Sequence, residues 1–152
     1  LIYGGVALPA NTMESVALEI QKQTGWDIIK LYGKAYHRFS RRVHHVFDAG
    51  PLEYLGLIKN ASVVLANSFH GTVFSINFGV PFYSYMPAKG DFGIRQQSIL
   101  RLLGLEARSA YPGQQLSELA PIKMDFTVAH QLLYQQRVKS INWLRENLQH
   151  VN

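Results

Sequence analysis

The feature that most constrains the fold is a short, almost continuously apolar run at residues 62–66 (SVVLA). Such a run suits a strand that is buried on both faces, as in a parallel sheet. Strand-like runs also occur at 26–32 and 81–86, and the opening LIYGG has the pattern of a strand that ends in a glycine turn. Segments with helical spacing separate these runs. The alternation predicts a doubly wound, Rossmann-like α/β sheet with strand 62–66 at its centre.

The helices are predicted from caps and from apolar spacing. Asn11 and Glu14 are spaced as a capping box, and the helix that they begin should end at Gly25. Further helices are expected at 49–61, 68–79 and 94–104, with Gly79 as the end of the second of these. The basic segment after residue 32 and the segment 87–93 are expected to be loops.

A long C-terminal helix is predicted within residues 125–150, with Asp125 as its N-cap. Its apolar residues recur at helical spacing: Tyr134, Val138, Ile141, Leu144 and Leu148. Because aromatic residues at this spacing are usually core residues, Tyr134 and Trp143 are expected to be buried. Residues 1–152 are thus expected to form one α/β domain. The start at Leu1, without a methionine or a signal-peptide pattern, suggests a fragment whose true start lies upstream.

The net charge of +5 is concentrated in residues 30–45, which contain no acid. The basic residues and histidines there are Lys30, Lys34, His37, Arg38, Arg41, Arg42, His44 and His45. This segment could attract a phosphorylated substrate, an acidic polymer or a membrane surface, or it could be a solvated loop. The absence of cysteine excludes disulfides and thiolate metal sites, and the adjacent His44 and His45 do not have metal-ligand spacing. No metal site is expected.

Polar residues follow strand 62–66 at the edge where doubly wound sheets bind ligands. Ser68, Phe69, His70 and Gly71 open the next helix, and a helix start exposes unpaired N–H groups that suit phosphate or carboxylate. His70 could donate to an anion or transfer a proton, and Gly71 would let a ligand approach the backbone. The alternatives are that Ser68 is only an N-cap and that His70 is a core histidine.

Two cations are expected near the same edge. Lys89 follows strand 81–86, and Arg95 opens the next helix, where its planar fork suits a carboxylate or phosphate. A solvated loop lysine and an exposed helix arginine are the competing interpretations.

The segment GPLEYLGLIKNASVVLANSFHGTVFSINFGVPFYSY resembles the conserved block of the polysaccharide pyruvyl transferase family, and GIRQQSILRLLGLEAR resembles a later family segment. The resemblance covers roughly residues 48–108. It implies the C-terminal lobe of a fold similar to B-type glycosyltransferases, with the site in a cleft against an N-terminal lobe that these residues do not include. Family members move a pyruvyl ketal from phosphoenolpyruvate onto a sugar, without a cofactor.

On this resemblance, His70 contacts phosphoenolpyruvate and acts as a general acid, while Ser68, Phe69, Gly71, Lys89 and Arg95 bind the substrate. The acceptor would be an exopolysaccharide or cell-wall glycan, or a lipid-linked saccharide. The enzyme would be cytoplasmic, with residues 30–45 available for contact with the inner membrane face. Two alternatives remain open: a nucleotide-sugar glycosyltransferase lobe, and a non-catalytic module that binds polyanions. Nucleic acid is disfavoured because few stacking aromatics accompany the basic charge.

Overall fold

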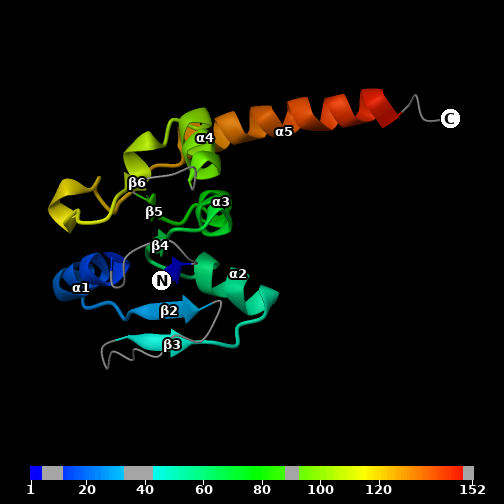
Figure 1. The fold of residues 1–152 in the computed structure, drawn as a ribbon. Helices are drawn as coiled ribbons and strands as arrows, with labels where there is room; N and C mark the ends of the chain where they lie inside the picture. Colours follow the sequence, from blue (N-terminus) through cyan, green and yellow to red (C-terminus); the bar gives the residue numbers. More distant parts are fainter. Residues whose placement is uncertain (5–11, 33–42, 88–92, 149–152) are drawn as a thin grey trace.

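A computed structural model describes residues 1–4, 12–32, 43–87 and 93–148 of the chain. Its described residues form a six-stranded sheet in the order β3-β2-β1-β4-β5-β6, and every pair of neighbouring strands is parallel (Figure 1). The strands are β1 (Ile2–Gly4), β2 (Ile29–Tyr32), β3 (His44–Val46), β4 (Val64–Ala66), β5 (Phe82–Tyr85) and β6 (Ser109–Ala110). The predicted doubly wound α/β fold is confirmed, and β4 is central between β1 and β5.

The order of the strands reverses between β1 and β4. Chain order runs outward through β2 and β3 on one side, and through β5 and β6 on the other. Tyr3 is in register with Ala66, so the ends of these two strands lie side by side. In sheets of this type the point of reversal opens a crevice at the carboxyl edge, which makes this edge the default place for a ligand.

Helices cover both faces of the sheet. Helix α1 (Thr12–Thr24) buries Val16, Ala17 and Ile20 against one face. The other face is covered by α2 (Pro51–Lys59), α3 (Phe69–Phe78) and α4 (Ile94–Leu102), which share a core with Val64, Ala66 and Phe82. Alternate residues of β4 therefore enter different cores, as the period of a strand requires, and this burial explains its continuous apolar run.

Two strands differ from the sequence-based prediction. Segment 44–46 was expected to be part of a loop, and no helix or strand was predicted at 109–110, but they form β3 and β6 at the two ends of the sheet. Each is only two or three residues long, and β3 reads HHV, so neither has an apolar pattern from which a strand could be identified. The expected Asn11 cap and residues 33–42 lie outside the described residues.

Helix ends follow the predicted chemistry. Gly79 ends α3 with a φ of 66°, a left-handed conformation that glycine adopts at little cost. Gly93 precedes α4 with a φ of 107°, so the entry into α4 also requires a glycine. Asp125 accepts a hydrogen bond of 2.9 Å from the Thr127 amide at the start of α5 (Thr127–Leu148). The first bond of α5 runs from the His130 amide to the Phe126 carbonyl oxygen, so Phe126 holds the N-cap position and the predicted cap, Asp125, lies one residue before it.

The long helix α5 projects away from the sheet beyond its first turns (Figure 1). Its first part is held by Ala129, which is buried, and by His130, whose Nε2 lies 2.6 Å from the carbonyl oxygen of Ile76. The prediction that Tyr134 and Trp143 are core residues is wrong, because they are 67% and 62% exposed. Apolar periodicity shows which residues share a face, but it does not show whether the domain covers that face. In the described part of the chain, no helix is both long enough and apolar enough to span a bilayer.

Candidate functional site

The turn between β4 and α3 lies at the carboxyl edge of the sheet, where the strand order reverses between β1 and β4. The Asn67 amide donates to the carbonyl oxygen of Tyr3, which ties the turn to the end of β1. The first bond of the helix runs from the Thr72 amide to the Ser68 carbonyl oxygen, at 3.0 Å. The amides of Phe69, His70 and Gly71 precede that bond, and no described residue accepts from them. They form an open set of donors at the positive end of the helix dipole.

Ser68 occupies the N-cap position but does not use its side chain as a cap. Its backbone is extended, with φ −108° and ψ 136°, and its hydroxyl makes no capping hydrogen bond. The position confirms the sequence-based assignment of the helix start. The hydroxyl is available, together with the amides that follow, to bind an anion.

His70 is exposed at this edge. The alternative that it is a core histidine is therefore wrong. Its ring lies edge-on to that of Phe69, with 6.0 Å between the ring centres. An exposed imidazole beside open amide donors can donate a hydrogen bond or a proton to a bound anion.

Phe69 connects the starts of α3 and α4. Its ring is partly buried, and the guanidinium carbon of Arg95 lies 5.1 Å from the ring centre. This cation–π contact holds a positive charge beside the α3 start while most of the arginine side chain stays exposed. The structure thus brings together the predicted residues Ser68, Phe69, His70 and Arg95.

Gly71 is buried, and its bare α-carbon faces the sheet. A β-carbon at this position would lie 2.8 Å from the Ala66 β-carbon and 3.2 Å from Cδ1 of Tyr3. Close packing of α3 on β4 and β1 therefore accounts for the missing side chain. What Gly71 offers a ligand is its backbone amide.

Tyr3 and Tyr54 pack behind this glycine, with their ring centres 4.8 Å apart. The Tyr54 hydroxyl is buried, and no residue in the described part of the chain forms a hydrogen bond with it. Burial, and then the neighbouring Tyr3, raise the pKa of Tyr54 above its ordinary value. The Tyr54 phenol therefore stays neutral.

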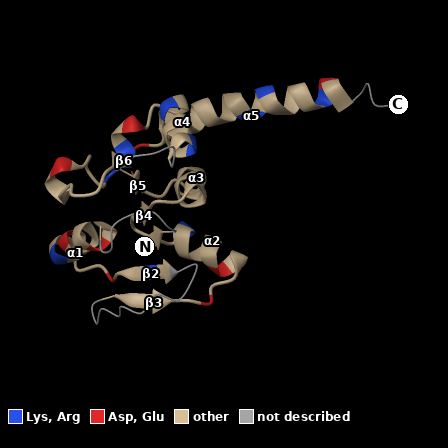
Figure 2. Ribbon diagram, viewed as in Figure 1, with Lys and Arg blue, Asp and Glu red and all other residues tan. Residues whose placement is uncertain are grey.

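The other cations singled out in the sequence are either not described or paired with an acid. Lys89 and residues 34–42 lie outside the described residues. Lys30 contacts the Glu14 carboxylate at 2.5 Å, so this end of the basic segment is paired with an acid. Basic residues also lie on α4 and along α5 (Figure 2), with Arg95 at the start of α4 and Arg101 near its end.

Two sets of buried polar residues were missed by the sequence analysis. The Gln96 side chain donates to the carbonyl oxygen of Asn67, and the Thr72 hydroxyl lies 2.8 Å from that of Ser84. Gln96 could have been suspected, because it lies one helical turn before the buried Leu100. The partners of these side chains depend on the packing of separate elements, which local sequence patterns do not show.

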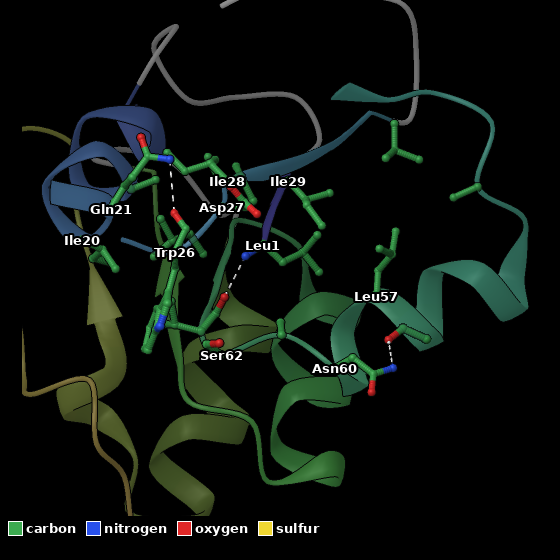
Figure 3. A pocket seen from close by; sticks show the side chains of 18 of the residues that line it. Leu1, Ile20, Gln21, Trp26, Asp27, Ile28, Ile29, Leu57, Asn60 and Ser62 are labelled. Carbon is green, nitrogen blue, oxygen red and sulfur yellow. Dashed lines mark hydrogen bonds between the residues drawn. The ribbon is translucent and has the colours of Figure 1, made fainter. Parts of the chain in front are cut away.

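A cavity of about 1190 Å³ lies elsewhere, beside α1, α2 and the start of β2 (Figure 3). Its lining includes Leu1, Trp26 and Leu57, and none of the predicted site residues. The cavity is therefore distinct from the α3 start.

Comparisons with known proteins point to one family. The sequence model described as polysaccharide pyruvyl transferase matches residues 7–87, which is more than half of the chain and includes the β4–α3 turn. Arg95 and Lys89 lie beyond the matched residues. Searches of curated proteins and of solved structures gave no match. Among the residues that the structure describes, no group of three histidines and acids is placed to hold a metal ion.

Proposed function

Because the chain belongs to the polysaccharide pyruvyl transferase family, we propose that it takes part in moving a pyruvyl ketal from phosphoenolpyruvate onto a sugar. The observation that carries the proposal is the open start of α3 at the strand-order reversal, with exposed His70 and Arg95 beside it. Phosphoenolpyruvate carries a phosphate and a carboxylate, which are the groups that a helix start and an arginine bind well.

In this proposal, different residues bind the two anionic groups of phosphoenolpyruvate. The amides of Phe69, His70 and Gly71 and the Ser68 hydroxyl bind one anionic group of the donor, and Arg95 binds the other. Arg95 is already held near the helix start by its contact with Phe69. Fixed donors of this kind cost no reorganisation when charge develops during the reaction.

Ketal formation requires proton transfers that His70 is placed to assist. Two sugar hydroxyls lose their protons as their oxygens bond to C2 of the enolpyruvyl group. One proton is balanced by the proton that C3 gains to become a methyl group, and the other by the proton on the phosphate that leaves as the C2–O bond breaks. The departing phosphate leaves most easily if it is protonated or hydrogen-bonded. We assign that role to His70, whose exposed imidazole lies beside the amides at the start of α3.

The proposed acceptor is an exopolysaccharide or cell-wall glycan, or a lipid-linked saccharide. A lipid-linked acceptor would place the reaction in the cytoplasm at the inner membrane face, where the positive charge of residues 30–45 would favour anionic lipid. The family membership supports the sugar acceptor, and the charge of this segment supports the location.

The direct test is a titration of the ¹⁵N-labelled chain with phosphoenolpyruvate. The proposal predicts saturable amide shifts at Ser68, Phe69, His70 and Gly71. Inorganic phosphate and a nucleotide sugar serve as comparison ligands. Shifts confined to residues 30–45, or the same shifts with any polyanion and a steep salt dependence, would instead support a polyanion-binding module. Shifts at the α3 start with the nucleotide sugar alone would favour a glycosyltransferase lobe.

A further inference from the structure

A chain of buried hydroxyls ends at the carbonyl group of Ser68. Thr72 Oγ1 donates to that carbonyl oxygen at 3.2 Å, and its distance to Ser84 Oγ is 2.8 Å. Thr72 has only one hydroxyl hydrogen, so Ser84 is the donor in the second bond. Thr72 and Ser84 are both fully buried. These two hydroxyl groups therefore connect strand β5 to Ser68, the residue just before α3.

The neighbouring carbonyl group is held from another direction. The side-chain amide nitrogen of Gln96, on α4, donates to the carbonyl oxygen of Asn67 at 3.1 Å. Gln96 is only 6% exposed, although it lies between the exposed Arg95 and the exposed Gln97. Two consecutive carbonyls of the turn are thus bound by buried side chains from α3 and α4.

Because a peptide unit is planar, these two contacts also determine the directions of two backbone amides. The carbonyl of residue 67 and the amide of residue 68 belong to one planar unit, and so do the carbonyl of residue 68 and the amide of residue 69. The two bonds in a trans unit point in opposite directions. Fixing the carbonyls of Asn67 and Ser68 therefore fixes the directions of the amides of Ser68 and Phe69.

We propose that Gln96 and Thr72, the latter supported by Ser84, are positioning residues. Thr72 aims the Phe69 amide at the bound anion, and Gln96 fixes the peptide unit that carries Ser68, whose hydroxyl binds the same anion. This inference rests on the proposed function of the α3 start. Gln96 also fixes α4, so Arg95 and the amides of the turn bind the donor as one rigid unit. An error of about 1 Å in the placement of such groups can reduce binding and catalysis by as much as about a hundredfold.

Matched variants of the chain test the proposal. Gln96→Met removes the donor with little change in volume, and Gln97→Met makes the same change at the adjacent exposed position. Thr72→Val removes the buried hydroxyl, and Thr72→Ser retains it. We expect Gln96→Met and Thr72→Val to weaken phosphoenolpyruvate binding about tenfold. Gln97→Met and Thr72→Ser should bind like the unmodified chain.

A second measurement needs no ligand. The amides of Asn67 and Thr72 are hydrogen-bonded in and beside the turn, and the Val80 amide is bonded at the far end of α3. In Gln96→Met, hydrogen exchange should become faster at Asn67 and Thr72 while Val80 is unchanged. A general loss of stability would speed up exchange at all three amides and would show that Gln96 is only a packing residue.

The outcomes separate this inference from the proposed function. If the unmodified chain does not bind phosphoenolpyruvate, the proposed function fails, and the exchange measurement alone decides whether Gln96 orders the turn. If the unmodified chain binds but Gln96→Met and Thr72→Val bind equally well, the positioning proposal is wrong and the proposed function stands.

Discussion

The guanidinium group of Arg95 stacks over the ring of Phe69, 5.1 Å from its centre, although the two residues belong to different helices. Phe69 is the first residue of α3, and Arg95 is the second of α4. Both helices begin at the carboxyl edge of the sheet, after β4 and β5. The contact therefore places a positive charge beside the amides at the start of α3, from which no described residue accepts a hydrogen bond.

This relationship predicts the effect of replacing Arg95. Arg95→Ala should weaken phosphoenolpyruvate binding by about tenfold to a hundredfold, the range expected for a hydrogen bond to a charged group. The affinity of Arg95→Lys should lie between those of the unmodified chain and Arg95→Ala, because lysine keeps the charge but lacks the planar fork of arginine. Titration calorimetry on the same chain provides the measurement. Arg101→Ala, at an exposed position near the end of α4, is the control and should bind normally.

A second prediction concerns Gly71. A β-carbon there would lie 2.8 Å from that of Ala66, so Gly71→Ala should lower the free energy of unfolding by about 1–3 kcal/mol. The matched control is Gly56→Ala in α2, where a β-carbon would meet no atom within 4 Å. That change should raise the stability by about 0.5–1 kcal/mol, because alanine favours a helix. Urea unfolding of both variants makes the comparison. Equal stability of the two would show that α3 does not pack closely on β4.

The fold could be predicted well where burial imposes a pattern on the sequence. The run at 62–66 is apolar because Val64, Leu65 and Ala66 enter cores on opposite faces of the sheet. The strand β3 could not be predicted, because backbone pairing with β2 stabilises a three-residue segment that begins with two histidines. The stripe on α5 was identified correctly, but its burial was not, because burial depends on what packs against the helix.

The residues of the candidate site could also be predicted only in part. Ser68 and His70 could be located because a strand followed by a helix start has a known ligand-binding edge. Gln96 could not be, because its contact with Asn67 joins residues 29 positions apart and depends on how α4 packs beside α3. Gly71 was expected to make room for a ligand, and the structure shows that it makes room for Ala66 and Tyr3.

Acid should loosen the start of α5. Hydrogen bonds from the backbone and side chain of Thr127 lower the pKa of Asp125 below its usual range. A carboxylate with a lowered folded-state pKa contributes stability that is present above its unfolded pKa and is lost as the pH falls through the folded value. The Thr127 amide shift should therefore titrate with a midpoint below about 3.9, the ordinary pKa of aspartate.

The control for this prediction is Asp125→Asn, which keeps an acceptor but cannot titrate. The Thr127 amide of this variant should show no such acid transition. If the unmodified chain titrates at the ordinary aspartate value, the hydrogen bonds from Thr127 do not favour the charged form of Asp125 and the prediction is wrong.

The central claim is that His70 acts on the donor at the start of α3. The most direct test measures pyruvyl transfer and thermal unfolding on the same His70→Ala variant, in a protein that also carries the N-terminal lobe that the family resemblance implies. We expect the transfer rate to fall by about a hundredfold or more, the usual scale for a lost acid–base group. The melting temperature should hardly change, because His70 is exposed. A variant that transfers pyruvyl groups at the unmodified rate, whether or not it is less stable, would contradict the account.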